Sequence, residues 1–121
     1  SNMSLPRMML CIVHDGHVAW DVKWRPVDAC NTLSSTSALG YLGVLLGNGA
    51  LEVWEVPHPH TLKRLYAAFQ ENADPRFIRL RPVFRCSFLK CGGDRQSIPL
   101  TLEWSAASPH DMILAGCHDG V

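Results

Sequence analysis

The stretch of sequence that decides the fold reads His14-Asp15-Gly16-His17-Val18-Ala19-Trp20-Asp21-Val22-Lys23-Trp24-Arg25-Pro26. Large apolar residues alternate with small or charged residues over positions 18–24, which is the period of a half-buried β-strand. The alternation places the valines and tryptophans on one face, and we expect that face to lie in the core. Arg25-Pro26 should end the strand, because proline has no N–H to donate to a neighbouring strand.

A second signal follows in Gly47-Asn48-Gly49-Ala50-Leu51-Glu52-Val53-Trp54-Glu55. Its Asn-Gly pair suits a tight hairpin, because both central residues of such a turn take a positive φ. A Gly-His pair before the first strand and a Trp-acid pair at the end of this one are typical of one blade of a WD40 β-propeller. A blade of this kind usually presents a binding surface rather than a catalytic site.

The same pattern occurs a second time in the chain. Residues 98–104 repeat the alternation of residues 18–24 and also end on a tryptophan. Residues 112–121 parallel residues 42–50, since each is an apolar strand that runs into a polar-glycine turn. Strand, turn and strand repeated at this interval indicate a radial β array. The positions that carry the blade pattern are Gly16, His17, Trp24, Asn48, Gly49, Trp54, Trp104, Asp119 and Gly120.

The sequence therefore predicts an all-β fold of WD40-type propeller blades with one short inserted helix. The helix is expected over residues 61–71, where apolar residues recur at helical spacing and Thr61 can cap the first turn. Residues 27–39 are polar and serine-rich and should form a surface loop, and His58-Pro59-His60 should form a rigid turn. The predicted strands are residues 7–13, 18–24, 40–46, 51–56, 77–89, 98–104 and 112–117.

Chain length limits how much of a propeller these residues can build. A WD40 blade takes roughly 40–45 residues and the smallest propellers have about four blades, which is more than 121 residues supply. Residues 1–2 resemble an expression-tag remnant, and residues 3–121 are expected to form a partial propeller. We divide it into blade 1 (residues 7–57), a helix-containing connection (58–76) and a truncated blade 2 (77–121). Open blade edges should associate with further blades, another chain or a second copy.

Composition narrows the class of protein. The chain is 47% apolar and 18% charged with a formal net charge of zero, which is typical of a globular core and argues against a globally basic nucleic-acid binder. No apolar run approaches the ~20 residues that span a bilayer, and no secretory signal is visible at the start. Five cysteines are an odd number with no disulfide-framework spacing, which favours a reducing, intracellular compartment.

Several segments follow one another in an order that resembles the WD-repeat (beta) subunit of the RNA polymerase III general factor TFIIIC and its plant relatives. The resemblance implies a non-enzymatic scaffold in the nucleus, within a multisubunit complex on promoters of small-RNA genes. It implies other protein subunits as the first partners and DNA only indirectly, with no catalytic residue, no cofactor, no metal and no membrane contact. The segments are Cys11-Ile12-Val13-His14-Asp15-Gly16, Trp20-Asp21-Val22-Lys23-Trp24, Leu39-Gly40-Tyr41-Leu42-Gly43-Val44, Val56-Pro57-His58-Pro59-His60 and Leu114-Ala115-Gly116-Cys117-His118-Asp119-Gly120.

The first repeat departs from the usual WD40 hydrogen-bond chain. In that family the chain runs from a turn aspartate through the histidine of the Gly-His pair and a strand hydroxyl to the tryptophan indole. Here His17 and Trp54 are present, but Asn48 replaces the aspartate and Leu46 stands where the hydroxyl would be. Glu55 replaces the aspartate of the Trp-Asp pair. We therefore expect the network to be incomplete in the first blade.

Cysteine and histidine residues give an alternative from another class of protein. Cys86 and Cys91 are separated by four residues, and Cys117-His118 follow later in the chain. A structural zinc site normally needs a second close pair of ligands, and none has the usual spacing here. A small metal-binding or enzymatic β module, with Cys91 and a histidine as a catalytic pair, is the resulting alternative.

A basic run gives a further alternative, direct contact with DNA. Its positive charges occur with no acidic residue between the first and the last, and alternation should place three arginines on one side of a strand. Phosphate contact, a solvated edge strand protected by charge, and an acidic protein partner all agree with this pattern. The residues are Arg76, Arg79, Arg81, Arg85 and Lys90.

Overall fold

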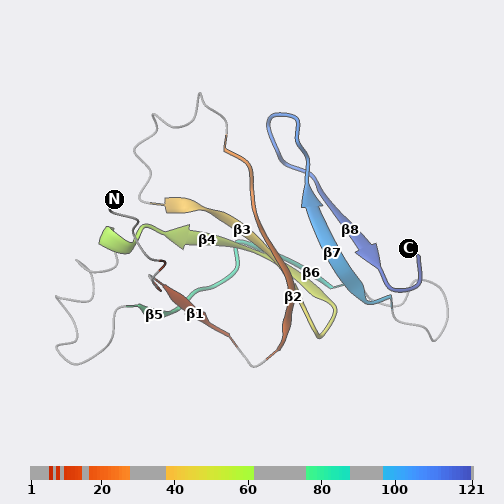
Figure 1. The fold of residues 1–121 in the computed structure, drawn as a ribbon, viewed down its shortest axis with the longest axis horizontal. Helices are drawn as coiled ribbons and strands as arrows, with labels where there is room; N and C mark the ends of the chain where they lie inside the picture. The colour runs from red at the N-terminus through yellow and green to blue at the C-terminus, as the bar shows by residue number, and fades with distance from the viewer. Residues whose placement is uncertain are drawn as a thin grey trace.

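The structure, a computed structural model, describes residues 6, 8, 10–14, 17–27, 38–61, 76–87 and 97–120. These residues form an all-β fold, as the sequence predicted, arranged in three sheets (Figure 1). The strands are β1 (Cys11–Val13), β2 (Ala19–Trp24), β3 (Ala38–Leu46), β4 (Ala50–Pro57), β5 (Phe77–Arg79), β6 (Phe84–Ser87), β7 (Pro99–Trp104) and β8 (Ile113–Cys117).

The largest sheet is antiparallel, with the order β2-β3-β4-β6. β2 ends at Trp24, immediately before Arg25-Pro26, as the alternation predicted. β4 is the most deeply buried strand, because β3 and β6 pair with its two edges and other elements cover its faces. This explains why residues 50–54 are all buried, including the charged residue Glu52.

The turn between β3 and β4 differs from the expected one. The N–H of Gly49 donates to the carbonyl of Leu46 at 3.0 Å, and Gly49 has a φ of 83°. Among the described residues His110 is the only non-glycine residue with positive φ, so Asn48 does not take the conformation we expected. The loop is instead a turn followed by a left-handed glycine, which is common in three-residue hairpins.

The predicted single strand over residues 77–89 is wrong, because it is broken into β5 and β6. Pro82 lies at the break, where a residue without an N–H cannot continue a ladder. β5 pairs in parallel with β1, whereas β6 pairs with β4. Phe84–Ser87 therefore belong to the same sheet as β2, β3 and β4, and the boundary that we placed at residue 77 between two blades does not match the sheet pairing.

The hairpin β7–β8 repeats the β2–β3 pair at the level of single residues. β2 pairs with β3 as Ala19↔Leu46, Asp21↔Leu45, Val22↔Val44, Lys23↔Gly43 and Trp24↔Leu42. β7 pairs with β8 as Pro99↔Cys117, Thr101↔Gly116, Leu102↔Ala115, Glu103↔Leu114 and Trp104↔Ile113. Each pair has its register shift at the same position, so the repeat seen in the sequence is also a repeat of strand register.

Backbone hydrogen bonds at both ends of the two pairs correspond in the same way. The N–H of Arg25 donates to Tyr41 at 2.8 Å, and at the equivalent position the N–H of Ser105 donates to Met112 at 2.9 Å. At the other end, the N–H of Gly47 donates to Val18 at 2.7 Å, and the N–H of His118 donates to Ile98 at 2.9 Å. Gly120, which follows β8, has a φ of 86°, close to that of Gly49 after β3. We therefore treat β2–β3 and β7–β8 as two copies of one unit.

A hydrophobic core joins the two copies. Leu45 and Leu51 of the large sheet pack with Leu102 of β7, and these three side chains are at most 4% exposed. A second cluster, formed by Val44, Leu46 and Ala50, lies on the other face of the large sheet. The second copy therefore stacks on one face of the first sheet and does not extend its edge.

Two predictions fall largely outside the described residues. Of the expected loop at 27–39, residues 28–37 are not described, and of the expected helix at 61–71, only Thr61 is described. Residues 59–61 have helical backbone geometry, and the rings of His58 and His60 stack at a centroid distance of 5.0 Å. In the described part of the chain, no helix is long and apolar enough to cross a membrane.

Candidate interaction surfaces

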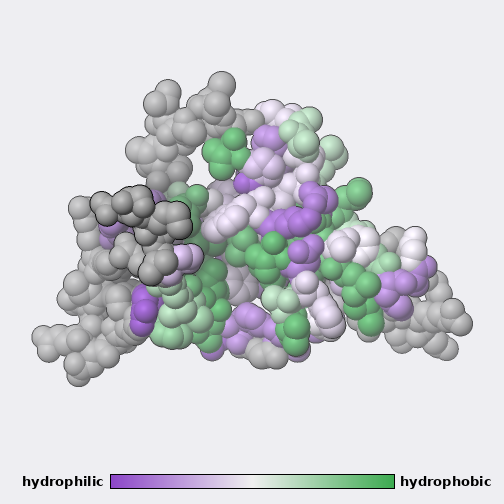
Figure 2. Space-filling model, viewed as in Figure 1, coloured by the Kyte–Doolittle hydropathy of each residue, from purple (hydrophilic) through white to green (hydrophobic). Residues whose placement is uncertain are grey.

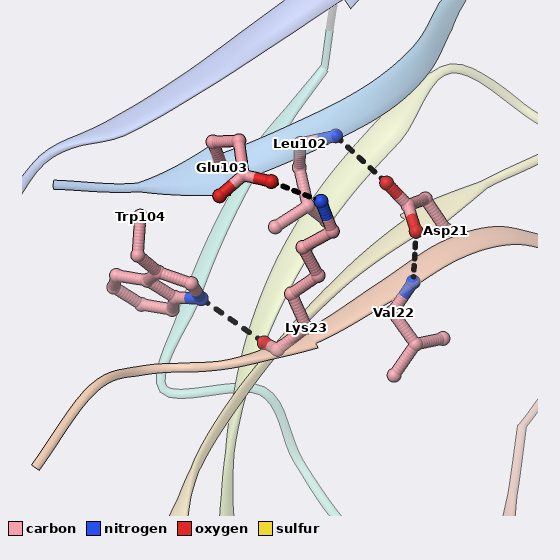
Figure 3. A network of polar contacts seen from close by, with 6 residues as sticks. All are labelled: Asp21, Val22, Lys23, Leu102, Glu103 and Trp104. Carbon is pink, nitrogen blue, oxygen red and sulfur yellow. Dashed lines mark hydrogen bonds and ion pairs between the residues drawn. The ribbon is translucent and has the colours of Figure 1, made fainter. Parts of the chain in front are cut away.

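The two copies of the strand unit are held together by polar contacts between β2 and β7 (Figure 3). The carboxylate of Asp21 accepts the backbone N–H of Leu102 at 2.9 Å, and its other oxygen accepts the N–H of Val22 at 3.0 Å. The indole N–H of Trp104 donates to the carbonyl of Lys23 at 3.0 Å. These bonds satisfy backbone groups of both strands, so they fix how β7 lies on β2.

Gly43 allows this close approach. A Cβ built on Gly43 would lie 3.2 Å from the indole nitrogen of Trp104 and 3.4 Å from Leu102. Lys23 forms an exposed ion pair with Glu103, and this hydrogen bond raises the pKa of Lys23 above its ordinary value. A raised lysine pKa means that the contact is present at neutral pH and is lost only as the pH rises through that pKa.

Substitution of Asp21 tests the contact between β2 and β7. Asp21→Ala is expected to lower the free energy of unfolding by about 1–3 kcal/mol, because the buried N–H of Leu102 loses its acceptor. Asp21→Asn should cost less, since its amide oxygen still accepts one hydrogen bond. Urea denaturation measures both variants, and an unchanged free energy of unfolding in Asp21→Ala would show that the Leu102 bond contributes nothing.

Arg25 makes a second connection between the copies. Its Nε donates to the carbonyl of His110 at 2.9 Å, and its terminal nitrogen donates to the carbonyl of Pro109 at 2.7 Å. The guanidinium also lies over the ring of Tyr41, 5.6 Å from the centroid. Arg25, the residue after β2, therefore holds the turn between β7 and β8.

The expectation that the valines and tryptophans of β2 lie in the core is wrong. In the described residues, the side of β2 that carries Asp21 and Lys23 packs against the second copy. Val22 and Trp24 lie on the other side and are 46% and 50% exposed. Figure 2 shows apolar residues reaching the visible surface at several places. We call the four exposed residues Val18, Trp20, Val22 and Trp24 the β2 stripe; the register shift between Ala19 and Asp21 separates the first pair from the second.

Two residues of the β2 stripe, Val22 and Trp24, correspond to residues that make contacts in the second copy. Val22 is equivalent to Leu102, which is 1% exposed because it packs on the large sheet. Trp24 is equivalent to Trp104, whose indole donates to Lys23. These two positions are thus contact positions in one copy and exposed in the other, whereas Ile98 and Leu100, the equivalents of Val18 and Trp20, are 37% and 42% exposed.

The residues that we predicted to carry the repeated pattern make different hydrogen bonds in the two copies. His17 is exposed, and the indole N–H of Trp54 donates at 2.7 Å to Glu52, two residues away. Asn48 bonds locally, accepting the N–H of Ala50 at 3.0 Å. In the second copy Ser97, at the position of His17, donates to Asp119 at 2.7 Å and so ties the two ends of the hairpin together. Gly16 lies outside the described residues.

The predicted arginine strand forms part of a hollow of about 370 Å³ on the other face of the large sheet. Arg79, Arg81 and Arg85 line it together with His14 and His17. Arg85 pairs with the buried carboxylate of Glu52 at 3.3 Å, and the Nδ1 of His14 is buried there without a hydrogen-bond partner in the described part of the chain. Arg76 is exposed outside this lining, and Lys90 is not described.

A groove of about 580 Å³ separates β8 from the outer half of the large sheet. Its walls are mainly apolar, with Leu51, Val53 and Phe84 on the large sheet and Ile113 and Ala115 on β8. Cys86 also lines it, and burial raises the pKa of this thiol above its usual value. A neutral thiol is a poor nucleophile and metal ligand.

The described residues do not support the alternative of a metal-binding module. Among them, no group of three or more histidine, cysteine or acidic side chains is placed to hold a metal ion. Cys91 lies outside the described residues, so its pairing with a histidine or with Cys86 stays a prediction.

Sequence reasoning missed the polar contacts that join the copies through Asp21 and Glu103, and the hydrogen bond of Ser97 within the second copy. The sequence did contain a signal, since Asp21 and Lys23 alternate with the apolar residues of β2. Their polarity alone, however, predicted that they face solvent.

No protein family, curated protein or solved structure matches this chain.

Proposed function

We propose that this chain is a non-enzymatic protein-interaction scaffold built from WD40-type propeller blades. One observation carries the proposal: Leu102 is buried where the second copy stacks on the large sheet, while its equivalent Val22 is exposed. Exposed rows of large apolar and aromatic residues are typical of protein interfaces. The β2 stripe is therefore proposed as the surface that contacts another protein subunit.

We further propose a nuclear assembly like TFIIIC, in RNA polymerase III transcription, as the place of this scaffold. The support is the order of the sequence segments given above, together with the two copies of one strand unit. In this role the protein holds other subunits in place by its shape, and DNA is approached through them.

The experiment is affinity purification of the chain from nuclear extract with identification of the co-purifying subunits. The unaltered chain is expected to retain other TFIIIC subunits, and the double variant Trp20→Ser, Trp24→Ser is expected to lose them while keeping its melting temperature. Leu39→Ser is the matched control, because Leu39 is 48% exposed on the neighbouring strand but outside the β2 stripe. Absence of such subunits from the unaltered sample would contradict the TFIIIC-like role.

A second candidate function, direct contact with DNA phosphates, is favoured by the arginine hollow. Arg81→Glu is expected to weaken DNA binding and to make its dependence on salt concentration shallower, since one phosphate contact is lost. Fluorescence anisotropy with a short duplex at several salt concentrations measures this slope. An unchanged salt dependence would contradict the hypothesis that DNA contacts the hollow.

A further inference from the structure

The unpaired edge of β8 borders the apolar groove between β8 and the large sheet. In the described part of the chain β8 pairs only with β7. The N–H of Ser105 donates to the carbonyl of Met112, so the backbone groups of Met112 point toward β7. In an antiparallel pair this direction alternates from one residue to the next. Ile113 and Ala115 consequently direct their N–H and carbonyl groups away from β7, while their side chains line the groove.

The first copy shows what occupies this position when it is filled. There β4 pairs with β3, as Val44↔Glu52 and Leu42↔Trp54. Val44 and Leu42 are equivalent to Ala115 and Ile113. A strand placed on β8 in the same register would therefore direct one side chain opposite Ala115 and a large one opposite Ile113 into the groove.

We propose that the edge of β8 and the groove beside it bind an extended strand of a partner polypeptide by β-strand addition. The strand runs antiparallel to β8, and a large aromatic side chain opposite Ile113 fills the groove against Leu51, Val53 and Phe84. Backbone hydrogen bonds to Ile113 and Ala115 supply affinity, and the apolar groove supplies selectivity. The groove volume of about 580 Å³ lies within the usual range of binding pockets.

This inference rests on the proposed scaffold function, since it names a second contact site and the kind of partner it takes. It uses a face of the molecule that does not include the β2 stripe. Loss of strand binding would therefore leave the test at Trp20 and Trp24 unaffected, and the two proposals fail separately.

The probe is a synthetic peptide with the sequence of residues 50–57, because β4 is the strand that fills the equivalent position. Titration into the ¹⁵N-labelled chain is expected to shift the amide signals of Ile113 and Ala115 downfield in a saturable way. A peptide with alanine in place of the tryptophan should bind roughly tenfold more weakly, because the aromatic anchor is gone. No saturable shift at these two amides would overturn the proposal.

Two N-methylated peptides test the strand pairing without altering the protein. N-methylation at the glutamate equivalent to Glu52 removes the N–H that faces Ala115 and should weaken binding roughly fivefold or more. N-methylation at the next residue, equivalent to Val53, is the matched control, because its N–H faces away from β8. Equal weakening by both peptides would show that binding does not use the β8 edge.

Two protein variants complete the test. Ala115→Pro removes an outward N–H without removing a bond to β7, so it should weaken binding of the unmethylated peptide through the lost hydrogen bond from residue 115. Leu114→Ala changes a residue that is 78% exposed and outside the groove lining, and should leave peptide affinity unchanged. Unchanged affinity of a folded Ala115→Pro variant would contradict the proposal, and the methylated peptides decide the matter if that variant does not fold.

Discussion

Trp54→Ala is expected to lower the free energy of unfolding by about 3–5 kcal/mol, the cost of truncating a buried tryptophan. Trp54 is 3% exposed at the centre of the large sheet, and its indole N–H donates to Glu52. Removing the indole leaves a cavity and also deprives a buried carboxylate of a donor. A loss of this size is a large share of the stability of a small domain.

Trp20→Ala is the matched control for this substitution. Trp20 is 53% exposed, so its replacement should change the free energy of unfolding by less than about 1 kcal/mol. Urea denaturation followed by circular dichroism measures both variants. If Trp20 costs as much as Trp54, the β2 stripe is buried in the isolated chain and our assignment of it as a free surface is wrong.

Leu102→Ala is expected to cost about 2–5 kcal/mol and to loosen the second copy selectively. Leu102 is 1% exposed and packs with Leu45 and Leu51 across the space between the sheets. Because an isolated two-stranded hairpin is marginally stable, β7 and β8 depend on this packing for their order. Amide hydrogen exchange in Leu102→Ala should therefore accelerate throughout β7 and β8 more than in β3 and β4.

Leu100→Ala separates packing from the general effect of a smaller residue in β7. Leu100 lies in the same strand and is 42% exposed. Its replacement should leave exchange in β8 nearly unchanged. Acceleration of equal size in both variants would show that β7 is held by its pairing with β8 and not by its contact with the large sheet.

The strands and the internal repeat could be predicted from the sequence because both depend on local patterns. Alternation from Val18 to Trp24 and the apolar run before Gly47 correspond to β2 and β3, and the glycine turns place their ends. The break at Pro82 could also have been predicted, since proline cannot continue a ladder inside a paired strand. Without that break, β5 and β6 were taken as one strand.

The covered face of β2 could not be predicted from its sequence. Alternation defines two faces of a strand but does not show which neighbour each face meets. Here the charged face is covered, because Asp21 accepts a backbone N–H of β7 and Lys23 offers its carbonyl to Trp104. Hydrogen bonds to the backbone of another strand leave no periodic signal in a sequence.

Both proposed interaction surfaces follow from the comparison of the two copies. Each surface includes a position that is covered in one copy and open in the other: Val22 of the β2 stripe is equivalent to the buried Leu102, and the free edge of β8 is equivalent to the edge of β3 that pairs with β4. The scaffold proposal thus depends on the equivalence of β2–β3 and β7–β8.

Nuclear Overhauser measurements on the chain in solution test this equivalence most directly. In antiparallel strands the Hα atoms of non-hydrogen-bonded pairs lie closest together. The account predicts Hα–Hα contacts for Val22 with Val44 and for Leu102 with Ala115, together with contacts between the Leu102 methyl groups and Gly43. A β7–β8 register shifted by one residue, which would turn Leu102 away from the large sheet, would contradict it.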